Sequence, residues 1–260
     1  MNHASVTHSL EGRTAIVTLN APQRRNSLDD VMMHELTEVL SSLNRQTAVR
    51  AVVLTGSGSA FCSGMDLAYL QKFSQLGQEE NLEDARTFLR LLQLITEMRK
   101  PVIAMVNGPA LGGGCGIAAA CDFVLAARSA AKIGVPEVRL GFVPAIILFY
   151  LIRRMGNGAA REFVLRGDIL DAETARLKGL VTQVIEDSQL QTDTLAFAET
   201  LAATVSPSSI ALTKDLLNRF HEMSTRDALE YAANLNALTR KTDDFRRGIE
   251  SFLKKEKLQW

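Results

Sequence analysis

The residues with the clearest chemical potential are three consecutive glycines, Gly112–Gly114, between two apolar segments. The run over residues 102–106 predicts a buried strand, which Asn107-Gly108-Pro109 ends. The small residues 117–120 favour a tightly packed helix. Unpaired N–H groups at the start of such a helix attract negative charge, and the helix dipole adds to this attraction. The glycines therefore indicate an anion-attracting turn, or simply a tight turn.

A second glycine turn has the same layout. Residues 51–66, AVVLTGSGSAFCSGMD, read as a buried strand, a Gly/Ser loop and the start of a helix. Two such turns could aim two backbone N–H groups at one carbonyl oxygen, which is the geometry of an oxyanion hole. Other phosphate-binding motifs are excluded, because a dinucleotide fingerprint needs glycine at Ile117 and a P-loop needs lysine at Gly114.

One carboxylate stands in a mostly apolar segment. Glu137 lies within residues 133–144, IGVPEVRLGFVP, next to Pro136 and Val138. Burial among apolar neighbours raises the pKa of a carboxyl group and suits it to proton transfer. A glutamate on a solvated surface is the alternative interpretation.

Together these segments resemble the crotonase (enoyl-CoA hydratase/isomerase) superfamily. The resemblance is carried in order by AFCSGMDL, KPVIAMVNGPALGGGCGIAAACD and GVPEVRLGFVP, and it extends from about residue 14 to about residue 255. It implies an α/β fold made of a spiral of ββα units with a C-terminal helical region. We expect the spiral core with its CoA-thioester site over residues 1–200. The helical region, at a subunit interface, is expected over residues 201–260.

The resemblance also implies the chemistry, which is stabilisation of the enolate of an acyl-CoA thioester. The matching oxyanion donors are the backbone N–H groups of Met65 and Gly113, and the matching proton-transfer group is Glu137. Asp66 is also expected to start a helix, and Asp122 to be structural. The residues expected to contact the substrate are Arg25, Ser63, Gly64, Asp66, Leu67, Gly112, Gly114, Gly116, Pro136 and Lys255.

Two departures from the family pattern bear on the reaction. Hydratases of the family use two glutamates, but the first position is Gly116 in this chain. Hydration of a 2-enoyl-CoA is the first hypothesis. A Δ3,Δ2-enoyl-CoA isomerase that works with one carboxylate is the second, and a non-catalytic acyl-CoA-binding protein is the third. The apolar run Ala145–Tyr150 replaces a glycine-rich turn, which indicates either a hydrophobic acyl pocket or a core helix.

Composition excludes several other classes. The 260 residues carry 29 basic and 29 acidic side chains, so no overall positive field favours nucleic acid or an anionic membrane. The three cysteines form no CxxC motif and are expected to be buried thiols, and the histidines show no metal-ligand spacing. We expect a cytoplasmic enzyme without metal or cofactor, with CoA as part of the substrate. The resemblance implies a homotrimer or a dimer of trimers.

Periodicity predicts alternating strands and helices, followed by a helical tail. One polar stretch, residues 74–83, is expected to be a loop. The expected strands cover residues 14–19, 51–55, 102–106, 122–127 and 181–185. The expected helices cover residues 29–43, 66–73, 84–98, 146–154, 159–165, 172–178, 190–204, 208–220, 225–239 and 245–254.

Overall fold

A computed structural model describes residues 4–73, 75–220 and 222–260. Its main sheet has six strands in the order β1-β2-β3-β4-β6-β9. The β1–β2 pair is antiparallel and the other neighbours are parallel. The strands are β1 (Val6–Glu11), β2 (Thr14–Leu19), β3 (Ala51–Gly56), β4 (Val102–Val106), β6 (Phe123–Ala127) and β9 (Gln183–Ile185).

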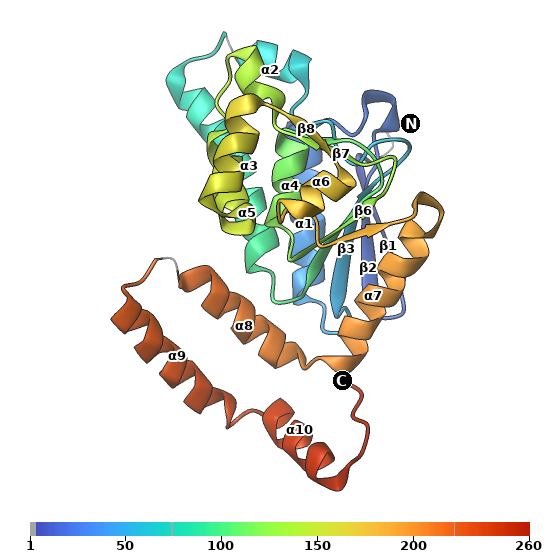
Figure 1. The fold of residues 1–260 in the computed structure, drawn as a ribbon, viewed down its shortest axis with the longest axis vertical. Coiled ribbons are helices and arrows are strands. Elements are labelled where there is room, and N and C mark those ends of the chain that lie inside the picture. The colour runs from blue at the N-terminus through green and yellow to red at the C-terminus, as the bar shows by residue number, and fades with distance from the viewer. Residues whose placement is uncertain (1–3, 74, 221) are drawn as a thin grey trace.

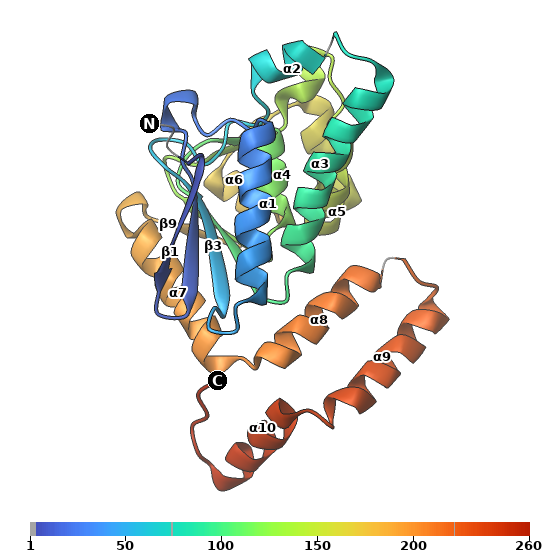
Figure 2. The same ribbon diagram turned by 180° about the vertical axis from the view of Figure 1, so that it is seen from behind.

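Helices cover this sheet on both sides, with α1 and α3 on one side and α7 on the other (Figure 2). Every residue of β3 and β4 is buried, as parallel strands between two helical layers require. The helices are α1 (Asp30–Arg45), α2 (Leu67–Phe73), α3 (Gln78–Glu97), α4 (Gly113–Ala120), α5 (Ala145–Arg166), α6 (Ala172–Leu177), α7 (Leu190–Thr204), α8 (Pro207–Arg219), α9 (Thr225–Thr239) and α10 (Asp243–Lys254).

A small three-stranded sheet, in the order β5-β7-β8, brings two of the motifs together. Strand β5 (Ala110–Leu111) runs parallel to β7 (Lys132–Gly134), and β8 (Ile169–Asp171) pairs with β7 in the opposite direction. The glycine run follows β5 directly. The 3₁₀ turn Pro136–Leu140, which carries Glu137, follows β7. Because parallel strands end at the same edge of a sheet, the glycine run and Glu137 become neighbours.

The last three helices extend away from the sheet (Figure 1). Helix α8 is tied to the core by Lys214, whose Nζ lies 2.6 Å from Asp122 Oδ2 and 2.9 Å from the Lys100 oxygen. Asp122 also accepts from the Val102 N–H, so its expected structural role is confirmed. Helix α7 crosses the expected boundary at residue 200, and the division into two units stays a prediction.

Several expectations from the sequence hold in detail. Asp29 accepts from the Met32 N–H and caps α1, and all three cysteines are buried and free. The loop expected over residues 74–83 is wrong for residues 78–83, which form the first turns of α3; Ser74 lies outside the described residues. Gly77 starts that helix without a side-chain cap, so no capping signal marked it. Strand β1 was not expected, because five of its six residues are exposed.

Within the described part of the chain, no single helix is both long and apolar enough to cross a membrane. Asp187–Thr204 and Pro207–Arg219 meet the requirements of length and composition as a pair, but they meet at a bend of 105°.

Candidate active site

The two glycine turns are held together by backbone pairing between segments 61–64 and 109–112. Cys62 and Ala110 form an isolated parallel bridge. The Cys62 N–H donates to Pro109, and the Leu111 N–H donates to Cys62. A Cβ atom at Gly64 would lie 2.8 Å from the Leu111 oxygen and 3.4 Å from the Gly113 nitrogen. The turns are therefore in contact, and Gly64, with φ of +92°, permits this approach.

The direction of two N–H groups follows from their peptide units. In a trans peptide the N–H points opposite to the C=O. The Gly64 oxygen accepts from the Leu28 N–H at 2.8 Å, so the Met65 N–H of the same unit points away from Leu28. The Gly112 oxygen accepts from the Gly116 N–H at 3.0 Å, so the Gly113 N–H points outward from the start of α4.

A cavity of about 1010 Å³ opens at this meeting point. It brings together most of the residues that the sequence singled out, and both N–H-bearing residues are part of its wall. The expected site residues that line it are Arg25, Ser63, Gly64, Met65, Asp66, Leu67, Gly112, Gly113, Pro136 and Glu137. A narrower apolar cavity of about 300 Å³ adjoins it and shares Met65, Gly113 and Glu137.

Glu137 brings a carboxyl group to the wall of both cavities. Its side chain lies against Gly112, where a Cβ atom would come within 2.7 Å of Oε1. Its Oε2 is buried and has no hydrogen-bond partner among the described residues. Burial raises the pKa of Glu137, which favours the protonated carboxyl group. The arrangement can therefore polarise an oxygen with two N–H groups and exchange a proton beside it.

The polar wall of the cavity is held by local hydrogen bonds. Asp66 accepts from the Ala68 and Tyr69 N–H groups, which confirms it as the residue that starts α2. These backbone bonds, with the Tyr69 bond first, lower the pKa of Asp66. The Arg25 oxygen accepts from the Ser63 N–H, which fixes the loop that carries Arg25 beside the second glycine turn. Arg25 adds positive charge to the cavity wall.

Gly116 lies outside the cavity lining, and Ile147 occupies the space beside it. A Cβ atom at Gly116 would come within 2.3 Å of Ile147 Cγ2 and 3.6 Å of Phe88 Cζ. Ile147 belongs to α5, within the apolar run Ala145–Tyr150, and it lines the narrower cavity. The two departures from the family pattern are thus physically linked, because the isoleucine fills the position of the absent glutamate.

Two more expected site residues also lie outside the lining. Gly114 is packed against Cys62, where a Cβ atom would come within 2.2 Å of the backbone oxygen, so its role is in packing. Lys255 follows α10 at the far end of the molecule from α2 (Figure 1).

Sequence reasoning missed the lining residues Leu70, Asp84, Ala85, Leu140 and Phe142. The helical spacing of Asp84, Phe88, Leu91 and Leu92 could have indicated that Asp84 shares a face with core residues.

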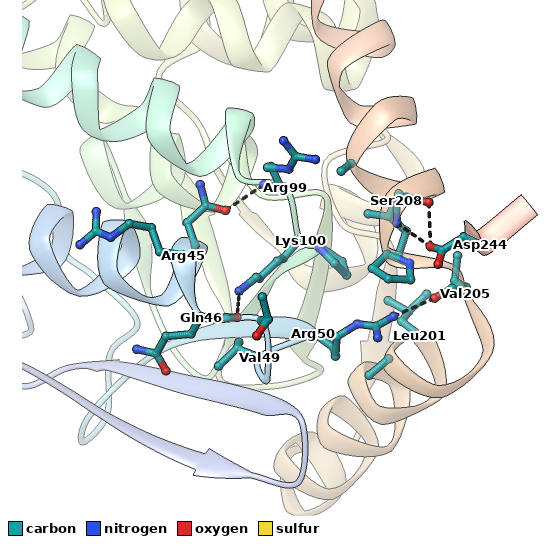
Figure 3. Close-up of a pocket in the computed structure, with 17 residues that line it drawn as sticks. Arg45, Gln46, Val49, Arg50, Arg99, Lys100, Leu201, Val205, Ser208 and Asp244 are labelled. Carbon is teal, nitrogen blue, oxygen red and sulfur yellow. Dashed lines mark hydrogen bonds between the residues drawn. The ribbon is translucent and has the colours of Figure 1, made fainter. Parts of the chain in front are cut away.

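A different cavity, of about 490 Å³, lies between the core and helices α7 and α8 (Figure 3). Two of its cations, Lys100 and Arg50, point to different backbone carbonyls. Lys100 donates to the Leu43 and Gln46 oxygens, and Arg50 donates to the Val205 oxygen. Burial, with a smaller effect of Arg50, lowers the pKa of Lys100 to about 8. These side chains join structural elements and do not converge on a common ligand position. Among the described residues no group of three or more His, Cys, Asp or Glu is placed for a metal ion.

The fold is that of a known class. Residues 10–260 match the family described as enoyl-CoA hydratase/isomerase. A crystal structure of an enoyl-CoA hydratase from Mycobacterium smegmatis superposes with a TM-score of 0.92 and 28% identity, covering 99% of each chain. One from Shewanella pealeana has a TM-score of 0.91 and 29% identity, covering 98% of this chain and 96% of the other.

Sequence relatives agree with the structural ones. A Crotonyl-CoA hydratase of Syntrophomonas wolfei is 32% identical, over 99% of this chain and 98% of the relative. A Short-chain-enoyl-CoA hydratase of Clostridium acetobutylicum is 32% identical, over 96% and 94%. The chain therefore belongs to the enoyl-CoA hydratase/isomerase family and has the crotonase fold, as its motifs indicated.

We predict that Gly112→Ala disables the site by displacing Glu137. The new methyl group would meet Glu137 Oε1 at 2.7 Å, and φ at this position is +51°. Gly156→Ala is the matched control, because φ is +75° there and nothing lies within 4 Å of the added atom. We expect kcat/KM to fall roughly 100-fold in the first variant only, as for loss of a positioned acid or base. Equal activity of the two variants would contradict this placement of Glu137.

We also predict that Gly116→Glu is tolerated only when Ile147 is made smaller. Alone, the change overfills the space beside Ile147 and costs about 1–3 kcal/mol, with a further cost for a buried carboxyl group. Ile147→Gly removes the colliding atoms, so it should cost less stability in the Gly116→Glu background than in the wild type. A double-mutant cycle of unfolding free energies measures the coupling. Purely additive effects would show that the two positions are independent.

Proposed function

We propose that this protein catalyses the hydration of 2-enoyl-CoA thioesters. The single observation that carries the proposal is the convergence of the Met65 and Gly113 backbone turns with Glu137 on one cavity. The names of its whole-length relatives as hydratases of crotonyl-CoA and short-chain enoyl-CoA agree with this reaction. The proposal includes no metal or cofactor, because the two backbone N–H groups and Glu137 supply the charge stabilisation and the proton transfer to carbon that it requires.

The mechanism begins with the thioester oxygen between the Met65 and Gly113 N–H groups, which serve as the oxyanion hole. As the water oxygen bonds to C3, the C2=C3 electron pair moves toward the thioester and places negative charge on its oxygen. Each positioned N–H donor is worth about 3–4 kcal/mol in such a transition state. Glu137, whose pKa is raised by burial, then gives its proton to C2. The product is a 3-hydroxyacyl-CoA.

The filled space at Gly116 favours one alternative, a Δ3,Δ2-enoyl-CoA isomerase. Glu137 alone could lift a proton from C2 and return it at C4, and the enolate would use the same oxyanion hole. The apolar narrower cavity suits either hydrocarbon acyl group. The two reactions leave different products, so product identity decides between them.

The experiment that tests the function supplies 2-butenoyl-CoA and 3-butenoyl-CoA to the wild type and to Glu137→Gln. We expect 3-hydroxybutanoyl-CoA from the first substrate and a loss of at least about 100-fold in kcat in the variant. Binding of butanoyl-CoA should change little, because the amide keeps the shape of the side chain. Isomerisation without any hydration would replace the proposal by its alternative. Full turnover by Glu137→Gln would remove Glu137 from the mechanism.

The proposal includes a homotrimer or a dimer of trimers. Apolar side chains exposed on α8–α10 support it, since exposed apolar surface favours burial against another subunit. They include Leu217, Leu229, Leu238, Ile249, Phe252 and Leu253. Light scattering should give three or six times the chain mass of 28.5 kDa, and a monomer would contradict this.

The proposal also places the protein in the cytoplasm. Three buried free thiols support this reducing location.

A further inference from the structure

With Glu137 as the only acid or base, hydration leaves one proton of the attacking water without an acceptor. The attacking water must lose a proton while Glu137 gives one to C2. Gly116 cannot serve as the base, and Ile147 fills the space beside it. Among the described residues, two carboxylates line both adjoining cavities, and these are Glu137 and Asp84. Asp66 lines only the larger cavity, where it is occupied in starting α2.

Helix α3 places Asp84 in the wall of both adjoining cavities. Phe88 lies one turn further along the same face, and its ring is 3.4 Å from the Cβ position of Gly113 and 3.6 Å from that of Gly116. Asp84 and Ala85 therefore continue the wall that Phe88 forms beside the oxyanion turn. Asp84 is half-buried, so its carboxylate can face both a bound acyl group and entering water.

Tyr69 fixes the orientation of this carboxylate. Its hydroxyl donates to Asp84 Oδ1 at 2.5 Å, which directs where the second oxygen, Oδ2, can point. Burial raises the pKa of Tyr69, and the hydrogen bond to Asp84 raises it further. The phenol therefore keeps its proton and remains a donor. Tyr69 is itself anchored, because its N–H donates to Asp66 Oδ1 in the second glycine turn. The oxyanion turn and Asp84 are thus linked through one tyrosine.

We propose that Asp84 is a second catalytic carboxylate, the base that takes the proton of the attacking water, with Tyr69 as its positioning residue. The inference rests on the proposed hydration of 2-enoyl-CoA. In this site the base comes from α3 and not from the position of Gly116.

The proton and electron balance is complete with these two carboxylates. The water oxygen forms its bond to C3 while one O–H bond breaks and its proton passes to Asp84. The π electrons of C2=C3 move to the thioester oxygen as an enolate. The enolate then returns this electron pair to form a C–H bond at C2 with the proton of Glu137. Asp84 ends protonated and Glu137 ionised, and proton exchange through solvent restores both.

The decisive variant is Asp84→Asn, because the amide oxygen can still accept the Tyr69 hydroxyl while the basic carboxylate is lost. Two rates are measured, namely hydration of 2-butenoyl-CoA and exchange of the C2 protons of butanoyl-CoA with deuterated water. Exchange needs Glu137 and the oxyanion hole but no attack by water. We expect Asp84→Asn to lower hydration at least about 100-fold and to leave exchange within about threefold. Glu83→Gln, the same change at an exposed neighbouring residue of α3, should alter neither rate.

Tyr69→Phe tests whether the Tyr69 hydroxyl positions the Asp84 carboxylate for hydration. It keeps the Asp84 carboxylate but removes the hydroxyl that orients it, so we expect a smaller loss of hydration, about tenfold, with exchange unchanged. If hydration by Asp84→Asn equals that of the wild type, the inference is wrong. If hydration and exchange fall by the same factor, Asp84 only holds the fold of the site, and the inference is again wrong. Wild-type protein that exchanges protons but hydrates no 2-enoyl-CoA contradicts the proposed function itself.

Discussion

The site depends on one short stretch of backbone pairing, between residues 61–64 and residues 109–112. This pairing sets two glycine turns against each other, so that the Met65 and Gly113 N–H groups belong to one cavity wall. Strands β5 and β7 pair in parallel, so the segments that follow them leave the small sheet at the same edge. Glu137 follows β7 and therefore lies beside the glycine turn that follows β5. The relative positions of Met65, Gly113 and Glu137 are therefore fixed by backbone hydrogen bonds, which tolerate side-chain changes around them.

The packing around this frame accommodates a glycine at position 116 without disturbing the two glycine turns. Ile147 fills the space beside Gly116, where a glutamate side chain at that position would lie. The wall of the narrower cavity is apolar, apart from Glu137 and Asp84. In such surroundings a charge on the thioester oxygen interacts strongly with its few donors, since little water screens them. The apolar run that replaced the glycine-rich turn thus belongs to the site and also to the packing of α5.

The sequence predicted the parts of the site that depend on backbone geometry. Glycine turns after buried strands leave a strong local pattern, and the cavity contains both of them and Glu137. Contacts between distant side chains leave no such pattern. The close packing of Ile147 against Gly116 could not be read from spacing, and neither could the hydrogen bond from the Tyr69 hydroxyl to Asp84. The start of α3 was missed for a local reason, because Gly77 offers no side-chain cap and the first turn is polar.

We propose that two backbone N–H groups hold the thioester oxygen of the substrate. A crystal structure of the protein with butanoyl-CoA would locate that oxygen without any assumption about the reaction. We expect the oxygen to lie about 2.7–3.1 Å from both the Met65 and the Gly113 nitrogen atoms, with C2 facing the Glu137 carboxyl group. A thioester oxygen that contacts neither nitrogen, in a well-ordered acyl-CoA, would contradict it.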